Sequence, residues 1–132
     1  MATKELSQFN ILIVDDAPVI LELMKGIFIE LGYSGVITAT NGHEALQELT
    51  AKEFDLILCD WDMPSMNGLE LLRVLRDQEK KNNEGKCIPF LMVTGKNDIK
   101  KVTEAIKLKV TDYIVKPFKP DEIKERLVKY FH

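Results

Sequence analysis

Short, uninterrupted apolar segments alternate along this chain with longer segments whose apolar residues recur at helical spacing, and this alternation restricts the fold most. The segments of continuous apolar character are predicted strands at Asn10–Val14, Val36–Ala39, Leu56–Cys59, Pro89–Thr94 and Asp112–Val115. The segments with helical spacing are predicted helices at Pro18–Leu31, Gly42–Lys52, Gly68–Asp77, Ile99–Leu108 and Asp121–Tyr130. Strands that are apolar throughout are typical of a parallel sheet covered on both faces. Because crossovers between parallel strands are right-handed, the predicted fold is a doubly wound α/β sheet with five strands.

The composition is that of one globular domain, which we expect to span residues 1–132 without an effector domain. A net charge of −3 argues against nucleic-acid binding, and no apolar run approaches the ~20 residues that cross a membrane. Met1–Asn10 lacks the apolar segment of a secretory signal, and Cys59 and Cys87 form no CxxC pair. We therefore expect a cytoplasmic monomer with reduced thiols. The polar stretch Gln78–Lys86 is predicted to be a solvated loop.

The conspicuous polar residues follow the predicted strands at the points where these strands end. Asp15 and Asp16 follow the first strand, Asp60 follows the third, Thr94 ends the fourth and Lys116 follows the fifth. In doubly wound sheets, ligands bind beyond the carboxyl ends of the strands. We therefore expect these five residues to be neighbours, although they are distant in the sequence.

Three aspartates in this group indicate a metal site, although each has a simpler interpretation. Asp15 and Asp16 could cap a helix, but Pro18 is expected to be the first helical residue, which places Ala17 at the cap. Asp60 could instead belong to a turn before the next helix. Two carboxylates about 4 Å apart repel by about 4 kcal/mol at an effective dielectric constant of about 20, so the cluster needs a cation. Carboxylate oxygens suit Mg²⁺.

Thr94 and Lys116 supply a hydroxyl donor and a cation, which are the groups that an incoming phosphoryl group needs. Taken alone, Lys116 would more simply be interpreted as a surface lysine. No general base and no deep substrate pocket are evident. The set favours phosphoryl transfer onto a carboxylate over the turnover of an external substrate, so we do not expect an enzyme in the ordinary sense.

Four motifs resemble those of the receiver domain of two-component response regulators, most closely the single-domain receivers of chemotaxis. They are Ile11–Asp16, Asp60–Gly68, Leu91–Gly95 and Tyr113–Phe118, and the resemblance covers about Phe9 to Phe131. Each motif is weak alone, but all four in order at this spacing are specific. The resemblance implies the flavodoxin-like strand order 2-1-3-4-5.

The resemblance also implies roles for the acids. Asp60 would be the phosphoacceptor, taking a phosphoryl group from the phosphohistidine of a sensor kinase and losing it later by hydrolysis within the same domain. Asp16 and Asp60 would bind Mg²⁺ directly, Asp15 through water, and Asp62 through its main-chain carbonyl. In this scheme Mg²⁺ is the cofactor.

For the remaining residues the resemblance implies binding and switching. Lys116 and Thr94 would bind the phosphoryl oxygens. Thr94 would then be drawn inward together with the ring of Tyr113, and this would change the face formed by the fourth helix, the fifth strand and the fifth helix. Such a change is a population shift between two existing conformations.

The implied partners are proteins: a sensor histidine kinase of the chemotaxis type, then the flagellar motor switch, or alternatively a histidine phosphotransfer protein if the chain is a relay intermediate or phosphate sink. A phosphatase could also act on it. The part from Lys96 onward has a net charge of +4, against −7 for the rest, which would suit an acidic partner or simply a solvated helix face. Where the family usually has small residues before Tyr113, this chain has Leu108, Lys109 and Val110.

Two other classes share part of this pattern. A haloacid-dehalogenase-type phosphatase uses an Asp-x-Asp motif, which Asp60–Asp62 imitates, but in that class the motif lies near the start of the chain, and here only 72 residues follow Asp60. A flavin mononucleotide carrier shares the fold class, but Asp15 and Asp16 would repel a phosphate after the first strand.

Overall fold

The structure is a computed structural model. It describes residues 5–82, 85, 87–95, 99–116 and 118–131, but not the side chains of residues 6, 99–101, 130 and 131. The strands are β1 (Asn10–Val14), β2 (Gly35–Ala39), β3 (Leu56–Asp60), β4 (Phe90–Thr94) and β5 (Asp112–Val115). The helices are a short 3-10 helix, η1 (Leu6–Gln8), and α1 (Pro18–Glu30), α2 (Gly42–Ala51), α3 (Gly68–Asn82), α4 (Ile99–Lys107) and α5 (Pro120–Phe131). Within the described ranges, no helix combines the length and the apolar character needed to cross a membrane.

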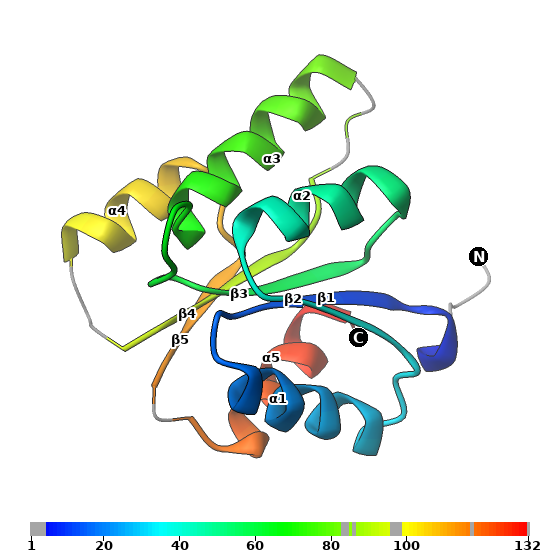
Figure 1. Ribbon diagram of the computed structural model, residues 1–132. Coiled ribbons are helices and arrows are strands. Elements are labelled where there is room, and N and C mark those ends of the chain that lie inside the picture. The colour runs from blue at the N-terminus through cyan, green and yellow to red at the C-terminus, as the bar shows by residue number, and fades with distance from the viewer. Residues whose placement is uncertain (1–4, 83–84, 86, 96–98, 117, 132) are drawn as a thin grey trace.

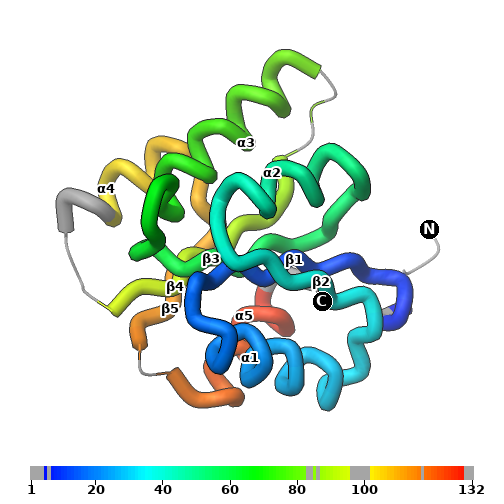
Figure 2. The backbone as a smooth tube through the Cα atoms, viewed as in Figure 1, coloured from blue at the N-terminus to red at the C-terminus, as the bar shows by residue number. Residues whose placement is uncertain are grey.

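The strands form one sheet in the order β2-β1-β3-β4-β5, and each neighbouring pair is parallel. This confirms the predicted doubly wound fold and its strand order. The register pairs Val14 with Cys59, and Thr94 with Val115. Consequently Asp15, which follows β1, lies beside Asp60, the last residue of β3. In the same way Lys116, which follows β5, lies beside Thr94, the last residue of β4. Figure 2 shows the chain leaving β1, β3 and β4 at the same edge.

Helices cover both faces of the sheet, α2, α3 and α4 on one and α1 and α5 on the other (Figure 1). Successive side chains of a strand point to opposite faces, so each strand serves both cores. In β1, Leu12 belongs to the core beneath α2, α3 and α4, whereas Ile13 belongs to the core beneath α1 and α5. Both side chains are fully buried, which explains why the strands are apolar at every position.

The start of α1 agrees with the prediction. Ala17 is the N-cap and Pro18 occupies the first helical turn. The main-chain N–H of Ala17 donates to Asp15 Oδ1 at 2.9 Å, so Asp15 shapes the turn before the helix without being its N-cap. Asp16 lies between them with an exposed side chain. Both acids therefore remain at the sheet edge.

The end of α3 corrects the sequence analysis. The predicted loop Gln78–Lys86 is helical as far as Asn82, and residues 83, 84 and 86 lie outside the described part of the chain. Gln, Glu and Lys are good helix formers, so a polar run of these residues does not by itself indicate a loop. In addition, Glu79 binds Arg76 one turn earlier at 2.7 Å, which supports the extension.

Candidate functional site

The three predicted acids meet at the carboxyl edge of the sheet. One carboxylate oxygen from each of Asp15, Asp16 and Asp60 lies within 4.8 Å of the others, and we call this group the acidic cluster. Asp15 is 1% exposed and Asp60 5% exposed, whereas Asp16 is open to solvent. The cause is the β1–β3 pairing, which continues from Val14 and Cys59 to the two buried acids. The predicted proximity of the acids is confirmed.

Lys116 reaches the same cluster from the end of β5. Its Nζ atom lies 3.1 Å from Asp60 Oδ1 and 3.5 Å from Asp15 Oδ2. Its main-chain N–H donates to the carbonyl oxygen of Thr94 at 2.7 Å. The surface-lysine interpretation is therefore wrong, because the ammonium group points at the two buried carboxylates. Pro117, part of the same motif, lies outside the described residues.

The electrostatics follow from this geometry. Burial raises the pKa of Asp60; the hydrogen bond from Lys116 opposes that shift, and the negative charge of Asp15 adds to it. Burial alone would lower the pKa of Lys116, but the hydrogen bond to Asp60 and the charge of Asp15 outweigh it, so the pKa of the lysine is raised. Burial, with the charges of Asp60 and Asp15, also raises the pKa of the Cys59 thiol well above its ordinary value. Because the Cys59 thiol is fully buried and its pKa is raised, Cys59 is a packing residue of the core and a poor nucleophile.

The charge balance of the acidic cluster indicates that a cation fits here. Asp15 Oδ1 accepts the hydrogen bond from Ala17, and the buried Asp15 Oδ2 faces the ammonium group of Lys116 at 3.5 Å. One ammonium group against three clustered carboxylates leaves a net negative charge, which a bound cation would offset. The donor set consists only of carboxylate oxygens, which are hard ligands that suit Mg²⁺. The acidic cluster therefore fits the predicted metal.

The remaining predicted residues lie on β4, on β5 and in the loop after β3. Thr94 ends β4 with 3% of its surface exposed. Tyr113 lies on β5, partly buried against the core beneath α2, α3 and α4. Asp62 follows β3 with an exposed side chain, and its predicted main-chain ligand role stays a prediction. Asp62 acts on the site at least through its charge, which contributes to raising the pKa of Asp60.

Gly68 is a supporting residue whose role the sequence analysis missed. Its N–H donates to the carbonyl oxygen of Trp61 at 2.9 Å, which closes the loop between β3 and α3. A Cβ atom at this position would lie 2.7 Å from the carbonyl oxygen of Asp60. Asn67 caps the helix by accepting from the N–H of Glu70, and Glu70 accepts from the N–H of Asn67 in return. The sequence signal was the capping box Asn67–Glu70 around a glycine.

Comparison with known proteins places this geometry in a family. Residues 11–128 match the response regulator receiver domain. The chain therefore belongs to the family of response regulator receiver domains. Members of the CheY type are signalling proteins, and receivers bind Mg²⁺ at an acidic cluster of this kind.

Named relatives and solved structures agree with this assignment. The chain is 37% identical over 122 residues to the chemotaxis protein CheY of Pseudomonas aeruginosa, covering 92% of this chain and 95% of that protein. It is 38% identical over 122 residues to CheY-3 of Vibrio cholerae, covering 92% and 91%. Among structures, Vibrio cholerae CheY4 superimposes with a TM-score of 0.82 at 31% identity, covering 92% and 97%. The response regulator TrrA of Thermotoga maritima, solved in complex with Mg²⁺-BeF, gives a TM-score of 0.78 at 33% identity, covering 92% and 98%.

Proposed function

We propose that this protein is a Mg²⁺-dependent phosphoacceptor that receives a phosphoryl group on Asp60 from the phosphohistidine of a sensor kinase. One observation carries the proposal: a buried Asp60 carboxylate shares the acidic cluster with Asp15 and Asp16 while Lys116 Nζ lies 3.1 Å away.

The chemistry requires Asp60 as an anion. An oxygen of its carboxylate attacks the phosphorus atom as the bond between phosphorus and the histidine nitrogen breaks, and the imidazole leaves. Lys116 raises the anionic population of Asp60 before the reaction and offers its positive charge to the phosphoryl oxygens afterwards. The hydroxyl of Thr94 donates to one of these oxygens.

Asp16 and Asp60 would hold Mg²⁺ directly, Asp15 would hold it through water and Asp62 through its main-chain carbonyl. When bound, the ion supplies positive charge that stabilises the phosphoryl oxygens. The acidic cluster supplies hard oxygen ligands for this ion, and Asp15 Oδ2 could accept a hydrogen bond from a metal-bound water. Hydrolysis then returns Asp60 to its carboxylate, with water as the acceptor and no external substrate turned over.

The signal passes from the acidic cluster to the face formed by α4, β5 and α5, which we call the output face. Thr94 moves toward the phosphoryl group, and the ring of Tyr113 turns inward into the space that it leaves. The main-chain bond from Lys116 to the carbonyl of Thr94 supports this route, because it couples the ends of β4 and β5. The phosphoryl group makes more favourable contacts in the conformation with Thr94 and Tyr113 turned inward, so it shifts the population toward that conformation.

The output face suits a protein partner with acidic segments. The exposed lysines on or beside it include Lys107, Lys119 and Lys124. Arg126 and the exposed Lys129 both pair with Asp112, at 3.1 Å and 4.0 Å. Lys100 and Lys101 belong to the same basic part of the sequence, but their side chains lie outside the described residues.

The cellular role that we propose is chemotaxis signalling in the cytoplasm, as a monomer. A histidine kinase of the chemotaxis type would be the phosphodonor and the flagellar motor switch the target, with a phosphatase ending the signal. The relatives named CheY support this role. The competing role, as a phosphorelay intermediate or phosphate sink, would replace the motor switch with a histidine phosphotransfer protein.

Phosphotransfer followed by partner binding tests the proposal. The protein is incubated with a purified, radiolabelled chemotaxis kinase, and Asp60→Asn serves as the variant without an acceptor. We expect label on the wild-type chain alone, and tighter binding of the labelled form to a motor-switch protein. Return of the label to a histidine phosphotransfer domain, without motor-switch binding, would support the relay role. Equal labelling of Asp60→Asn would refute the proposal.

A further inference from the structure

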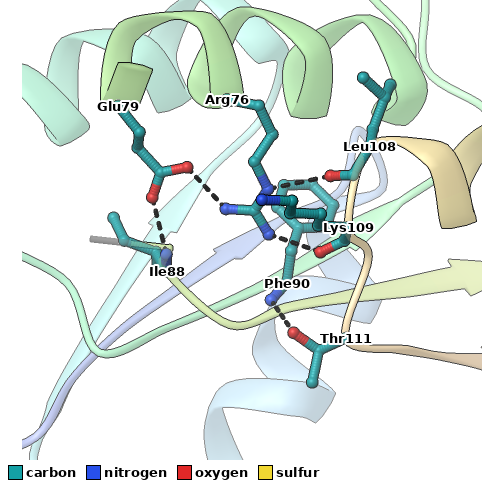
Figure 3. A network of polar contacts seen from close by, with 7 residues as sticks. All are labelled: Arg76, Glu79, Ile88, Phe90, Leu108, Lys109 and Thr111. Atoms are coloured by element: carbon teal, nitrogen blue, oxygen red, sulfur yellow. Dashed lines mark hydrogen bonds and ion pairs between the residues drawn. The ribbon is translucent and has the colours of Figure 1, made fainter. Parts of the chain in front are cut away.

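A buried arginine joins α3 to the end of α4 at the edge of the sheet opposite Asp60. Arg76 is only 6% exposed. Its Nε atom donates to the carbonyl oxygen of Leu108 at 3.0 Å, and its Nη2 atom donates to that of Lys109 at 2.8 Å (Figure 3). Its Nη1 atom binds Glu79 Oε1 at 2.7 Å. The guanidinium group thus has a protein partner on each of its three nitrogens.

Glu79 extends this connection to the sheet. Its second oxygen accepts from the N–H of Ile88 at 2.7 Å, just before β4 begins. In Figure 3 the dashed lines run without a break from Ile88 through Glu79 and Arg76 to the turn after α4. We call Arg76, Glu79 and their main-chain partners the Arg76 clamp. It ties α3, the start of β4 and the end of α4 into one unit.

The turn that the clamp holds has an unusual backbone. Lys109 has a φ of +59°, in the left-handed region that favours glycine. The N–H of Val110 donates to the carbonyl of Ala105, and the N–H of Lys109 donates to that of Ile106, each at 3.0 Å, which is a Schellman motif. Arg76 binds the two carbonyls that follow the helix, so it stabilises a lysine in a glycine-type position. This explains how Leu108, Lys109 and Val110 replace the small residues usual in the family.

We propose that Arg76 is a positioning residue that fixes the carboxyl-terminal turn of α4 as a pivot for the conformational switch. The inference rests on the proposed function, because a pivot has meaning only if phosphorylation moves the output face. As a crossover helix, α4 starts at the edge that carries Asp60 and returns to the opposite edge. The clamp holds the far end, so rearrangement on phosphorylation is confined to the part of α4 nearer the acidic cluster and to β5.

Amide hydrogen exchange and chemical shifts, measured by NMR with and without Mg²⁺ and beryllofluoride, test this pivot. Arg76→Met removes the clamp, and Arg76→Lys keeps the charge but offers one nitrogen where the guanidinium group uses three. Arg73→Met is the matched control, since Arg73 is exposed on the same helix. In the wild-type protein we expect beryllofluoride to shift the signals of Thr94 and Tyr113 while Lys109 and Val110 stay unchanged.

In Arg76→Met, exchange at Lys109 and Val110 should accelerate by about tenfold or more beyond any change at the core amide of Leu58, which marks global opening. Beryllofluoride shifts should then spread into the turn. Arg76→Lys should show the same changes more weakly, and this variant keeps the test valid if Arg76→Met does not fold. The control Arg73→Met should show no such change.

Two results would overturn the pivot. Exchange that accelerates equally at the turn and at Leu58 would show that Arg76 merely stabilises the whole fold. Beryllofluoride shifts at Lys109 and Val110 of the wild-type protein as large as those at Tyr113 would show that the turn moves with the switch. If beryllofluoride changed no signal anywhere, the proposed function would fail and the pivot with it, whereas the exchange data would still report the clamp as a structural feature.

Discussion

The main-chain N–H of Lys116 donates to the carbonyl oxygen of Thr94 at 2.7 Å, so the two residues expected to bind a phosphoryl group are held by one hydrogen bond between β4 and β5. The same lysine carries its ammonium group to Asp60 and Asp15. In the proposed switch, a displacement of the Thr94 main chain would pass through this hydrogen bond to β5, the strand that bears Tyr113. The acidic cluster and the face formed by α4, β5 and α5 thus share one strand, β5.

The buried oxygen of Asp15 should decide Mg²⁺ affinity. Asp15→Asn keeps an oxygen for the Ala17 N–H but removes the charge that the acidic cluster offers to the ion. We expect Mg²⁺ to stabilise the wild-type protein against urea and the variant to bind it at least about tenfold more weakly, a difference of about 1.4 kcal/mol. Asp121→Asn, which changes an exposed acid on α5, is the control. Equal Mg²⁺ stabilisation of all three proteins would contradict the assignment of Asp15.

Removal of the Lys116 charge should separate metal binding from phosphoryl binding. In Lys116→Met, the acidic cluster loses its nearby cation, so we expect Mg²⁺ to bind several-fold more tightly while beryllofluoride binds more weakly. The fluorescence of Trp61, which is 4% exposed and adjoins Asp60, reports both events. Lys119→Met changes an exposed lysine and should alter neither. Parallel weakening of both ligands would show that Lys116 acts on the fold instead.

Two glycine substitutions should have opposite effects on stability. A Cβ at Gly68 would meet the Asp60 carbonyl at 2.7 Å, so Gly68→Ala should lower the free energy of unfolding by about 1–3 kcal/mol. At Gly26, within α1, a Cβ would have no neighbouring side chain within 4 Å, so Gly26→Ala should raise it by about 0.5–1 kcal/mol. Urea denaturation measures both. A neutral Gly68→Ala would mean that the loop after Asp60 is loosely packed.

Alkaline pH should weaken the fold through Tyr33. Burial between the rings of Phe9 and Phe28 raises the pKa of its hydroxyl. Because the folded-state pKa exceeds the unfolded one, Tyr33 leaves stability unchanged below its ordinary pKa and lowers it as the pH rises past that value. Tyr33→Phe keeps the ring contacts and should lose stability less steeply in this range. Identical alkaline profiles by urea denaturation would contradict the burial of this hydroxyl.

The sequence predicted the sheet and the acidic cluster well because both depend on local patterns and on a general rule of topology. Once Asn10–Val14 and Leu56–Asp60 are parallel neighbours, the acids after Val14 and at Asp60 must meet. Long-range polar contacts were not predictable. In the last turns of α3, Arg76 and Glu79 contact the turn after α4 and the residue Ile88 before β4, which are far away in the sequence. The sequence pattern likewise shows neither the left-handed Lys109 nor the proximity of Gly68 to Asp60.

The most direct test of the central claim is to locate the acyl phosphate. The protein is incubated with Mg²⁺ and a small phosphodonor, the adduct is trapped by borohydride reduction, and the modified residue is identified by mass spectrometry. The account predicts modification at Asp60, dependent on Mg²⁺ and absent from Asp60→Asn. Modification of another side chain, or of Asp60 to the same extent without Mg²⁺, would contradict it.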